Sequence, residues 1–205
     1  MALPAAVSTR QLKHRRAIDV QVFACGDGLW QVDATLTDTK TRDVPMVSGI
    51  RPAGTPIHEM LLRVVVDRSL TIVEAGSETR WMPYTGFCDR HGDKHGAEQG
   101  DAYEQLKGLN LMRGFRAALR ERLGGVLGCT HISELAQVLP TAVIQAFAGE
   151  VIDTHGTAPE AQRPFQIDRC HALRSEGEVV RTYYPRWFRQ PDAKLGEDNG
   201  KTGSN

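Results

Sequence analysis

The spacing of apolar residues changes once along this chain, from every second position to every third or fourth. Between residues 18 and 75 apolar and polar side chains alternate, as around Val20 and Val22 and again around Val32. Alternation is typical of strands that bury one face, and an Asp-Gly pair between two alternating runs indicates a hairpin. From residue 102 the apolar residues follow the helical period. The sequence therefore predicts an α+β fold in which antiparallel strands precede helices.

About four strands are expected, arranged as an antiparallel β meander. They fall in two hairpins, over residues 18–37 and 60–75. The Pro- and Gly-rich stretch at 41–57 is expected to be a loop or an irregular edge. Residues 76–101 are predicted to be the least regular part of the domain. The two-residue period leaves one face of the meander in need of a cover.

Two main helices are expected to supply that cover. The first spans residues 111–122 and ends at Gly124, and the second begins at Thr130, a suitable N-cap, and runs to Phe147. Pro140 falls inside the second helix. Because proline lacks the N–H that a helix interior needs, Pro140 is expected to kink or split this helix.

These patterns divide the chain into four regions: a flexible arm at 1–13, a single α+β domain at 14–148, an irregular C-terminal extension packed on the domain at 149–189, and a disordered tail at 190–205. Within the extension, residues 165–171 and 179–184 are expected to form an edge hairpin or a docked arm. The tail is rich in Asp, Gly, Asn and Lys. Such a composition offers little apolar surface to bury.

Composition and missing motifs exclude several classes of function. Lysine plus arginine equals aspartate plus glutamate, at 25 each, so the basic excess of a nucleic-acid-binding protein is absent. The chain has no run of 18 apolar residues and no secretory leader, so we expect a cytoplasmic protein with reduced thiols. The sequence patterns of phosphate-binding loops, dinucleotide-binding folds, zinc proteases and serine hydrolases do not occur.

A glycine-led turn places a thiol and an imidazole at the start of the second helix. Cys129 and His131 follow Gly128 there, where free N–H groups and the helix dipole favour an anion and so the thiolate of Cys129. Glu134 lies three residues after His131 and shares its helix face. The alternative interpretation is a small buried cysteine beside a hydrogen-bonded capping histidine.

Two further candidates lie at strand ends. His58 enters the third strand in register with Met60, on the face expected to be buried. It is a candidate proton acceptor, because histidine titrates near neutral pH without help; otherwise it is a structural histidine with satisfied hydrogen bonds. Asp38 and Lys40 end the second strand, where they could face a pocket mouth. The competing interpretation is a turn in which Asp38 bonds to its own backbone.

Cys88, His91 and His95 offer zinc-ligand types at spacings of three and four residues. A structural zinc site needs four Cys or His ligands, usually in two pairs, and the chain has no second pair with the usual spacing. We therefore interpret this stretch as a polar loop and predict no metal site.

Taken in order, several motifs resemble the bacterial family catalogued as domain of unknown function 2889, over residues 10–148. The motifs are His14-Arg15-Arg16, Asp27-Gly28-Leu29-Trp30, Leu36-Thr37-Asp38-Thr39-Lys40, Ile57-His58-Glu59-Met60-Leu61-Leu62-Arg63, Arg120-Glu121-Arg122-Leu123-Gly124-Gly125 and Gly128-Cys129-Thr130-His131. The resemblance implies a link to the catabolism of aromatic or other small carbon compounds, including cofactor-free lyases that release formaldehyde from lignin-derived dimers. Residues 91–95 and the C-terminal extension are departures from the shared pattern.

Two functions are therefore expected as alternatives. The first is an enzyme without cofactor or metal that uses general acid–base chemistry on a small organic substrate. The second is a non-catalytic domain that binds a small ligand or forms a homodimer. In the first, the expected catalytic residues are His131, His58, Cys129, Asp38 and Tyr84. The expected substrate-binding residues are Arg16, Lys40, Arg63, Glu59 and Glu134. Neither nucleic acid nor a membrane is an expected partner.

Overall fold

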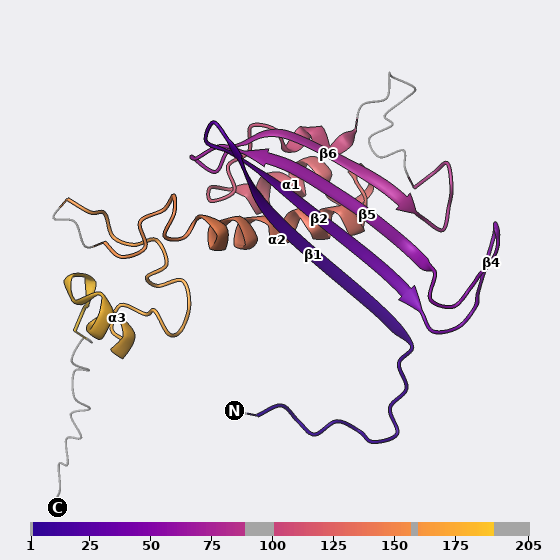
Figure 1. The fold of residues 1–205 in the computed structure, drawn as a ribbon, viewed down its shortest axis with the longest axis horizontal. Coiled ribbons are helices and arrows are strands. Elements are labelled where there is room, and N and C mark those ends of the chain that lie inside the picture. Colours follow the sequence, from indigo (N-terminus) through magenta and orange to yellow (C-terminus); the bar gives the residue numbers. More distant parts are fainter. Residues whose placement is uncertain (1, 89–100, 157–159, 191–205) are drawn as a thin grey trace, which may run out of the picture. The chain divides into compact units, whose positions relative to one another are not determined.

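The computed structural model describes residues 2–88, 101–156 and 160–190, and its main feature is one antiparallel sheet (Figure 1). The chain runs through this sheet as a meander, in the strand order β1-β2-β5-β6. The four strands are β1 (His14–Gly26), β2 (Leu29–Lys40), β5 (Pro56–Val66) and β6 (Ile72–Trp81). The predicted meander is confirmed.

The first hairpin turns through residues 26–28, all of which have positive φ. Two of the three are glycines, which adopt this conformation without steric cost. The turn fixes a register in which Arg16 lies opposite Asp38. In the next strand pair Asp38 lies opposite His58. Three neighbouring strands therefore bring polar residues to one end of the sheet.

Two stretches are more regular than predicted. Within residues 41–57, β3 (Val44–Met46) and β4 (Gly49–Arg51) pair as a small two-stranded sheet. β6 continues to Trp81, so the prediction that residues 76–81 are irregular is wrong. Their polar side chains are compatible with a strand because β6 is an edge strand, and its ladder needs only backbone hydrogen bonds to β5.

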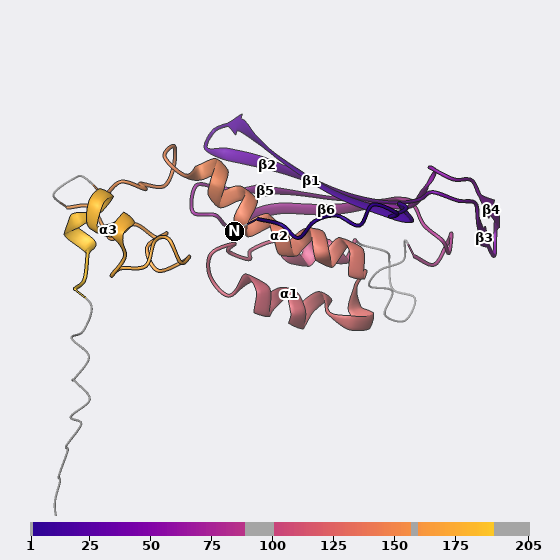
Figure 2. The ribbon, with the colours of Figure 1, turned by 90° about the horizontal axis from the view of Figure 1, so that it is seen from below.

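Two main helices cover one face of the sheet, which confirms the predicted α+β class (Figure 2). The helical elements of this part of the chain are η1 (Ala102–Leu106), α1 (Phe115–Leu123), η2 (Gly125–Leu127) and α2 (Thr130–Phe147). α1 ends at Gly124 and α2 begins at Thr130, as the sequence predicts.

The hydrophobic core lies between the sheet and these helices. Side chains with at most 1% exposure come from β2, β5, β6, η1, α1 and α2, as in Leu36, Leu62 and Leu139. β1 differs from the prediction that its apolar residues are buried: Ile18 faces the same side as Leu36 but is 39% exposed. As an edge strand, β1 has a neighbour on one side only.

α2 is one helix that contains Pro140, so the proline does not split it. A proline inside a helix removes one backbone hydrogen bond. Leu139 and Val143, on either side of Pro140, are fully buried. Their packing against the core offsets the loss of that hydrogen bond.

The chain divides into two compact units, Met1–Ala146 and Phe147–Asn205. The described residues of the second unit form turns, α3 (Glu178–Tyr183) and η3 (Pro185–Trp187), and contain no strand. Of the two alternatives expected for residues 165–171 and 179–184, the edge hairpin is therefore wrong, and the docked arm stays a prediction. Within α3, Glu178 and Arg181 pair one turn apart at 2.6 Å, an exposed contact that stabilises a helix only slightly.

Two predictions about the chain ends stay predictions. The packing of residues 149–189 on the domain is one. The disorder of the tail is the other, since residues 191–205 lie outside the described residues. Residues 2–13 contain neither helix nor strand.

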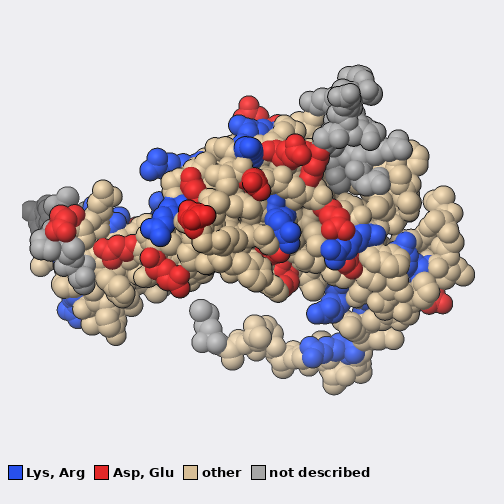
Figure 3. All heavy atoms as spheres, turned by 45° about the horizontal axis from the view of Figure 1, so that its top comes forward, with Lys and Arg blue, Asp and Glu red and all other residues tan. Residues whose placement is uncertain are grey.

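In the part of the chain that the structure describes, no helix has the length and apolar character needed to cross a bilayer. On the face shown in Figure 3, basic and acidic side chains are interspersed rather than separated by sign. Arg63 and Asp33, on adjacent strands, form one ion pair between exposed or half-buried side chains, at 2.6 Å.

Candidate functional site

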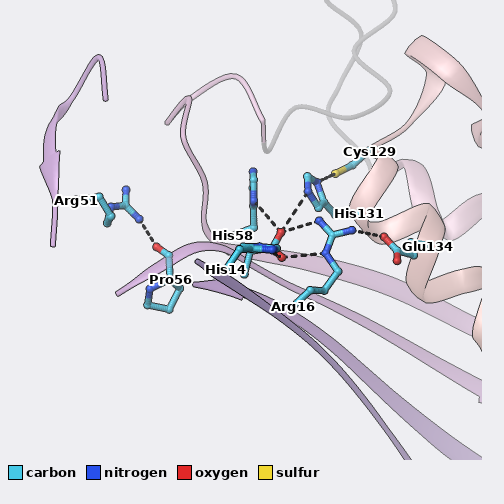
Figure 4. A network of polar contacts seen from close by, with 9 residues as sticks. His14, Arg16, Arg51, Pro56, His58, Cys129, His131 and Glu134 are labelled. Carbon is cyan, nitrogen blue, oxygen red and sulfur yellow. Dashed lines mark hydrogen bonds and ion pairs between the residues drawn. The ribbon is translucent and has the colours of Figure 1, made fainter. Parts of the chain in front are cut away.

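The carboxylate of Asp38 is buried, with only 3% exposure, on the helix-covered face of β2. A carboxylate is rarely buried unless charged or hydrogen-bonding groups satisfy it. Four side chains gather around it, and together with Asp38 they form what we call the Asp38 cluster: Asp38, His14, Arg16, His58 and His131 (Figure 4).

Arg16 on β1 forms a bidentate ion pair with Asp38. Its Nε donates to Oδ1 at 2.9 Å and its Nη2 donates to Oδ2 at 2.7 Å. The third nitrogen of the guanidinium, Nη1, donates to Oε2 of Glu134 on α2 at 2.6 Å. Arg16 therefore connects the edge of the sheet to the helix that covers it.

Three histidines, each from a different element, face the same carboxylate. Nε2 of His14, at the start of β1, lies 2.9 Å from Oδ1 of Asp38. Nδ1 of His58 on β5 lies 3.2 Å from Oδ2, and Nε2 of His131 on α2 lies 3.7 Å from the same oxygen. The rings of His58 and His131 face each other, with centroids 4.0 Å apart and an interplanar angle of 30°.

The electrostatics of the cluster favour an ionised Asp38 beside neutral imidazoles of His58 and His131. Burial opposes ionisation of Asp38, but hydrogen bonds and charges from Arg16 and His14 outweigh it and lower the pKa to about 2. Burial lowers the pKa of His58, against the opposing pull of Asp38. Burial also lowers the pKa of His131, and the charges of His58 and Arg16 add to that effect.

Cys129 lies at the edge of the cluster. Its Sγ is 3.7 Å from Nδ1 of His131. The backbone of Cys129 is held by Tyr103, whose hydroxyl accepts from the Cys129 N–H at 2.9 Å and donates to the Cys129 carbonyl at 2.8 Å. Burial raises the pKa of Tyr103 to about 12, so the phenol keeps its proton at neutral pH. This contact fixes the turn that leads into α2.

The cluster is reachable from solvent. The side chain of His14 is 37% exposed, and those of His58 and His131 are each 20% exposed. One ligand atom from each of Asp38, His58 and His131 lies within 4.8 Å of the other two. These three residues are the described ones that could hold a metal ion.

The structure brings together six of the residues that the sequence suggests for a site: His131, His58, Cys129, Asp38, Arg16 and Glu134. His14 also belongs to the cluster, although the sequence analysis does not single it out as a site residue. The signal that could have found it is the hairpin register, because His14 pairs with Lys40, two residues beyond Asp38.

Two of the four other candidates lie on the opposite face of the sheet. Arg63 and Glu59 are an odd number of residues from His58 along β5, so strand alternation points them to the uncovered face. There Arg63 pairs with Asp33 and Glu59 with Arg80, the latter at 3.5 Å.

Tyr84 is 59% exposed in the segment after β6. Lys40 is the last residue of β2, directly opposite His14. Of the zinc-type loop residues only Cys88 is described; His91 and His95 lie outside the described residues.

Comparison with protein families gives one match. A family described as "Protein of unknown function (DUF2889)" matches residues 14–145. This range contains every member of the Asp38 cluster, together with Cys129 and Glu134. Comparisons with curated proteins and with solved structures found no match.

Proposed function

Because the chain belongs to the DUF2889 family, whose description names no activity, we propose its function from the geometry of the Asp38 cluster. We propose an enzyme that uses general acid–base chemistry on a small organic substrate. One observation carries the proposal: a buried carboxylate, already neutralised by Arg16, is faced by three histidines from separate elements. Arg16 by itself already supplies a counter-charge and two hydrogen bonds to Asp38. Additional titratable groups around a satisfied charge are typical of catalytic sites.

The histidines can serve as proton acceptors because each has one nitrogen turned toward Asp38. An N–H directed at the carboxylate fixes the tautomer and leaves the lone pair on the other ring nitrogen. For His58 that nitrogen is Nε2. His131 makes no such hydrogen bond, since its Nε2 is 3.7 Å from Oδ2 of Asp38; its Nδ1 lies 3.7 Å from Sγ of Cys129. A substrate hydroxyl placed against either nitrogen would lose its proton to the imidazole.

The reaction class that we propose is a lyase that releases formaldehyde. Removal of the proton from a substrate –CH2OH group lets the adjacent carbon–carbon bond break. Its electron pair stays on the remaining carbon, and the protonated imidazole returns the proton there. The products are formaldehyde and the substrate skeleton with hydrogen in place of the lost group. Aromatic, lignin-derived compounds with a hydroxymethyl group are the substrates that fit the family resemblance.

We also propose a cytoplasmic location. Cys25, Cys88, Cys129 and Cys170 are all free thiols, which suits a reducing compartment. A homodimer stays a proposal as well: among the described residues β1 pairs only with β2, and a free strand edge is a ready template for pairing with a second chain.

The test is a formaldehyde assay with a panel of hydroxymethyl-bearing aromatic dimers. We expect His58→Ala and His131→Ala each to lower turnover by about 100-fold or more, because general acid–base catalysis contributes at least that factor. His155→Ala, a change at an exposed histidine outside the cluster, is the control. Folded cluster variants that keep full turnover would exclude the proposal. A protein without turnover on the whole panel would favour the ligand-binding alternative.

A further inference from the structure

Three ligand atoms of the Asp38 cluster converge on one point. Oδ2 of Asp38 lies 3.2 Å from Nδ1 of His58 and 3.7 Å from Nε2 of His131, and all three atoms lie within 4.8 Å of one another. Around a tetrahedral cation with bonds of about 2.1 Å, neighbouring ligand atoms are about 3.4 Å apart. The two distances that involve Asp38 bracket this value.

Hydrogen bonding alone does not explain the position of His131. Its Nε2 is 3.7 Å from Oδ2 of Asp38, which is too long for a hydrogen bond. A bridging water, with two hydrogen bonds of about 2.8 Å at a bent angle, would need the two atoms about 4.5 Å apart. A cation bound by both atoms needs a spacing between these two limits. The gap between His131 and Asp38 therefore has the size of a metal ion.

The chemistry of the three ligands indicates which cation fits. Two imidazoles and one carboxylate suit divalent first-row transition metals, zinc among them, rather than calcium or magnesium, which prefer oxygen ligands. Three protein ligands also match catalytic metal sites, in which a further position stays open for water or substrate. The exposure of His58 and His131 leaves a route to that open position.

The outer contacts orient the ligands as metal sites require. Oδ1 of Asp38 accepts from Arg16 and approaches His14, which directs Oδ2 toward the other two histidines. Arg16 also donates to Oδ2, so this oxygen would be shared with the cation. Glu134 also forms an ion pair with Arg16, whose Nη1 donates to Oε2 of Glu134 at 2.6 Å. Asp38 and Glu134 against Arg16 leave one net negative charge, which favours a cation.

We propose that Asp38, His58 and His131 bind one divalent transition-metal ion, through Oδ2, Nδ1 and Nε2 respectively. The proposal goes beyond the prediction of a metal-free enzyme, and it rests on the proposed function only in sharing its site. With the ion bound, His58 and His131 no longer serve as bases. A bound ion would lower the pKa of a water on it, and the hydroxide left after that water loses its proton would be the group that accepts the substrate proton.

The test is a titration of the full-length, chelator-treated protein with Zn²⁺ and, separately, with Co²⁺. We expect one ion per chain with micromolar or tighter affinity, and a rise in the melting temperature when the ion is present. His58→Ala, His131→Ala and Asp38→Asn should each weaken binding by about 100-fold or more, because each removes a direct ligand. His14→Ala should weaken it by about 10-fold, as expected for an outer contact. His155→Ala is the matched histidine control.

Circular dichroism separates lost binding from lost folding. A variant that folds, but whose melting temperature no longer rises when Zn²⁺ is added, supports the assignment. Binding weaker than millimolar, or a one-to-one complex that is unchanged in His58→Ala and His131→Ala, would overturn it. Turnover that persists in chelator and does not respond to added ions would also overturn it and would leave the imidazole mechanism standing. One-to-one binding without turnover on any substrate would support the metal site and count against the enzyme.

Discussion

Asp38 depends on Arg16 more than Arg16 depends on Asp38, because only the carboxylate is fully buried. The side chain of Asp38 is 4% exposed and that of Arg16 is 35% exposed. Arg16 also keeps Glu134 as a second partner. Without Arg16, by contrast, Asp38 would keep only histidines, which offset its charge only if they become protonated.

We therefore expect Arg16→Met to lower the free energy of unfolding by about 3 kcal/mol and Asp38→Asn by about 2 kcal/mol. The double variant should lose less than the sum, with a coupling of at least about 1 kcal/mol. Urea unfolding of the three variants at pH 7, in chelator, measures these values. Additive losses would show that the two side chains do not interact in solution.

At the scale of single residues, the sequence identifies members of the Asp38 cluster more readily than it shows that these members come together. His131 and Cys129 are recognisable from the helix start, and His58 from its place on a buried strand face. The convergence of Asp38 with them depends on two strand registers, which place Arg16 and His58 on either side of it. Arg63 was expected at the site although its strand parity points it away, a miss that register alone would have corrected.

At the scale of elements, one buried hydroxyl joins η1 to the start of α2. The hydroxyl of Tyr103 contacts both backbone groups of Cys129 and approaches Oγ of Ser133 at 3.1 Å. Tyr103 is fully buried. Burial raises its pKa to about 12 from the ordinary 10.0, against the opposing effect of these hydrogen bonds.

This shift makes stability depend on pH in the alkaline range. Because the folded pKa of Tyr103 is the higher one, its contribution is complete below pH 10 and is lost as the pH rises toward 12. We expect the difference in unfolding free energy between the wild type and Tyr103→Phe to shrink by about 1 kcal/mol from pH 9 to pH 11. Tyr84→Phe, at an exposed tyrosine, should show no such trend. A constant difference for Tyr103→Phe would contradict the burial effect.

The turn between α1 and α2 leaves no room for a side chain at Gly128. A Cβ at this position would lie 2.7 Å from the carbonyl oxygen of Leu123 and 3.0 Å from the hydroxyl of Tyr103. Gly125, by contrast, has a φ of 59° and open space around a Cβ. The first glycine is needed for close approach, and the second for its backbone conformation.

We expect Gly128→Ala to cost about 2 kcal/mol or more, since the backbone must move to relieve the overlap. Gly125→Ala should cost about 1 kcal/mol, the penalty of a left-handed conformation. Only Gly128→Ala should also weaken Zn²⁺ binding, because it displaces the turn that carries His131. Thermal unfolding and Zn²⁺ titration of the two variants check this. Equal losses of stability and affinity would show that the close contact is not critical.

The positions of helices and strands were predictable where apolar spacing determines them. They were less predictable where edge position or packing determines where an element ends. The strands of the meander and the start of α2 at Thr130 follow from spacing and capping. The end of β6 and the continuity of α2 at Pro140 depend on edge position and on packing. In the second unit, residues 178–183 form a helix, where an edge hairpin was one of the two expected alternatives.

At the scale of the whole molecule, the site belongs to one unit. The first unit, Met1–Ala146, contains the sheet, α1 and all of α2 except its last residue. It also contains every member of the Asp38 cluster. Phe147 is fully buried, and its carbonyl accepts from the N–H groups of Val151 and Ile152 at 2.9 and 3.0 Å. The second unit therefore begins by capping the end of α2.

We expect a chain that ends at residue 149 to fold cooperatively, because the first unit has a core of its own. Loss of the cap on α2 should lower the free energy of unfolding by about 1 kcal/mol, as for other helix caps, and leave Zn²⁺ affinity within about threefold. Urea unfolding and Zn²⁺ titration of this truncated chain are the measurements. A loss of about 3 kcal/mol or more would instead favour the prediction that residues 149–189 pack on the domain. If the truncated chain unfolds without a cooperative transition, the first unit is not an independent domain.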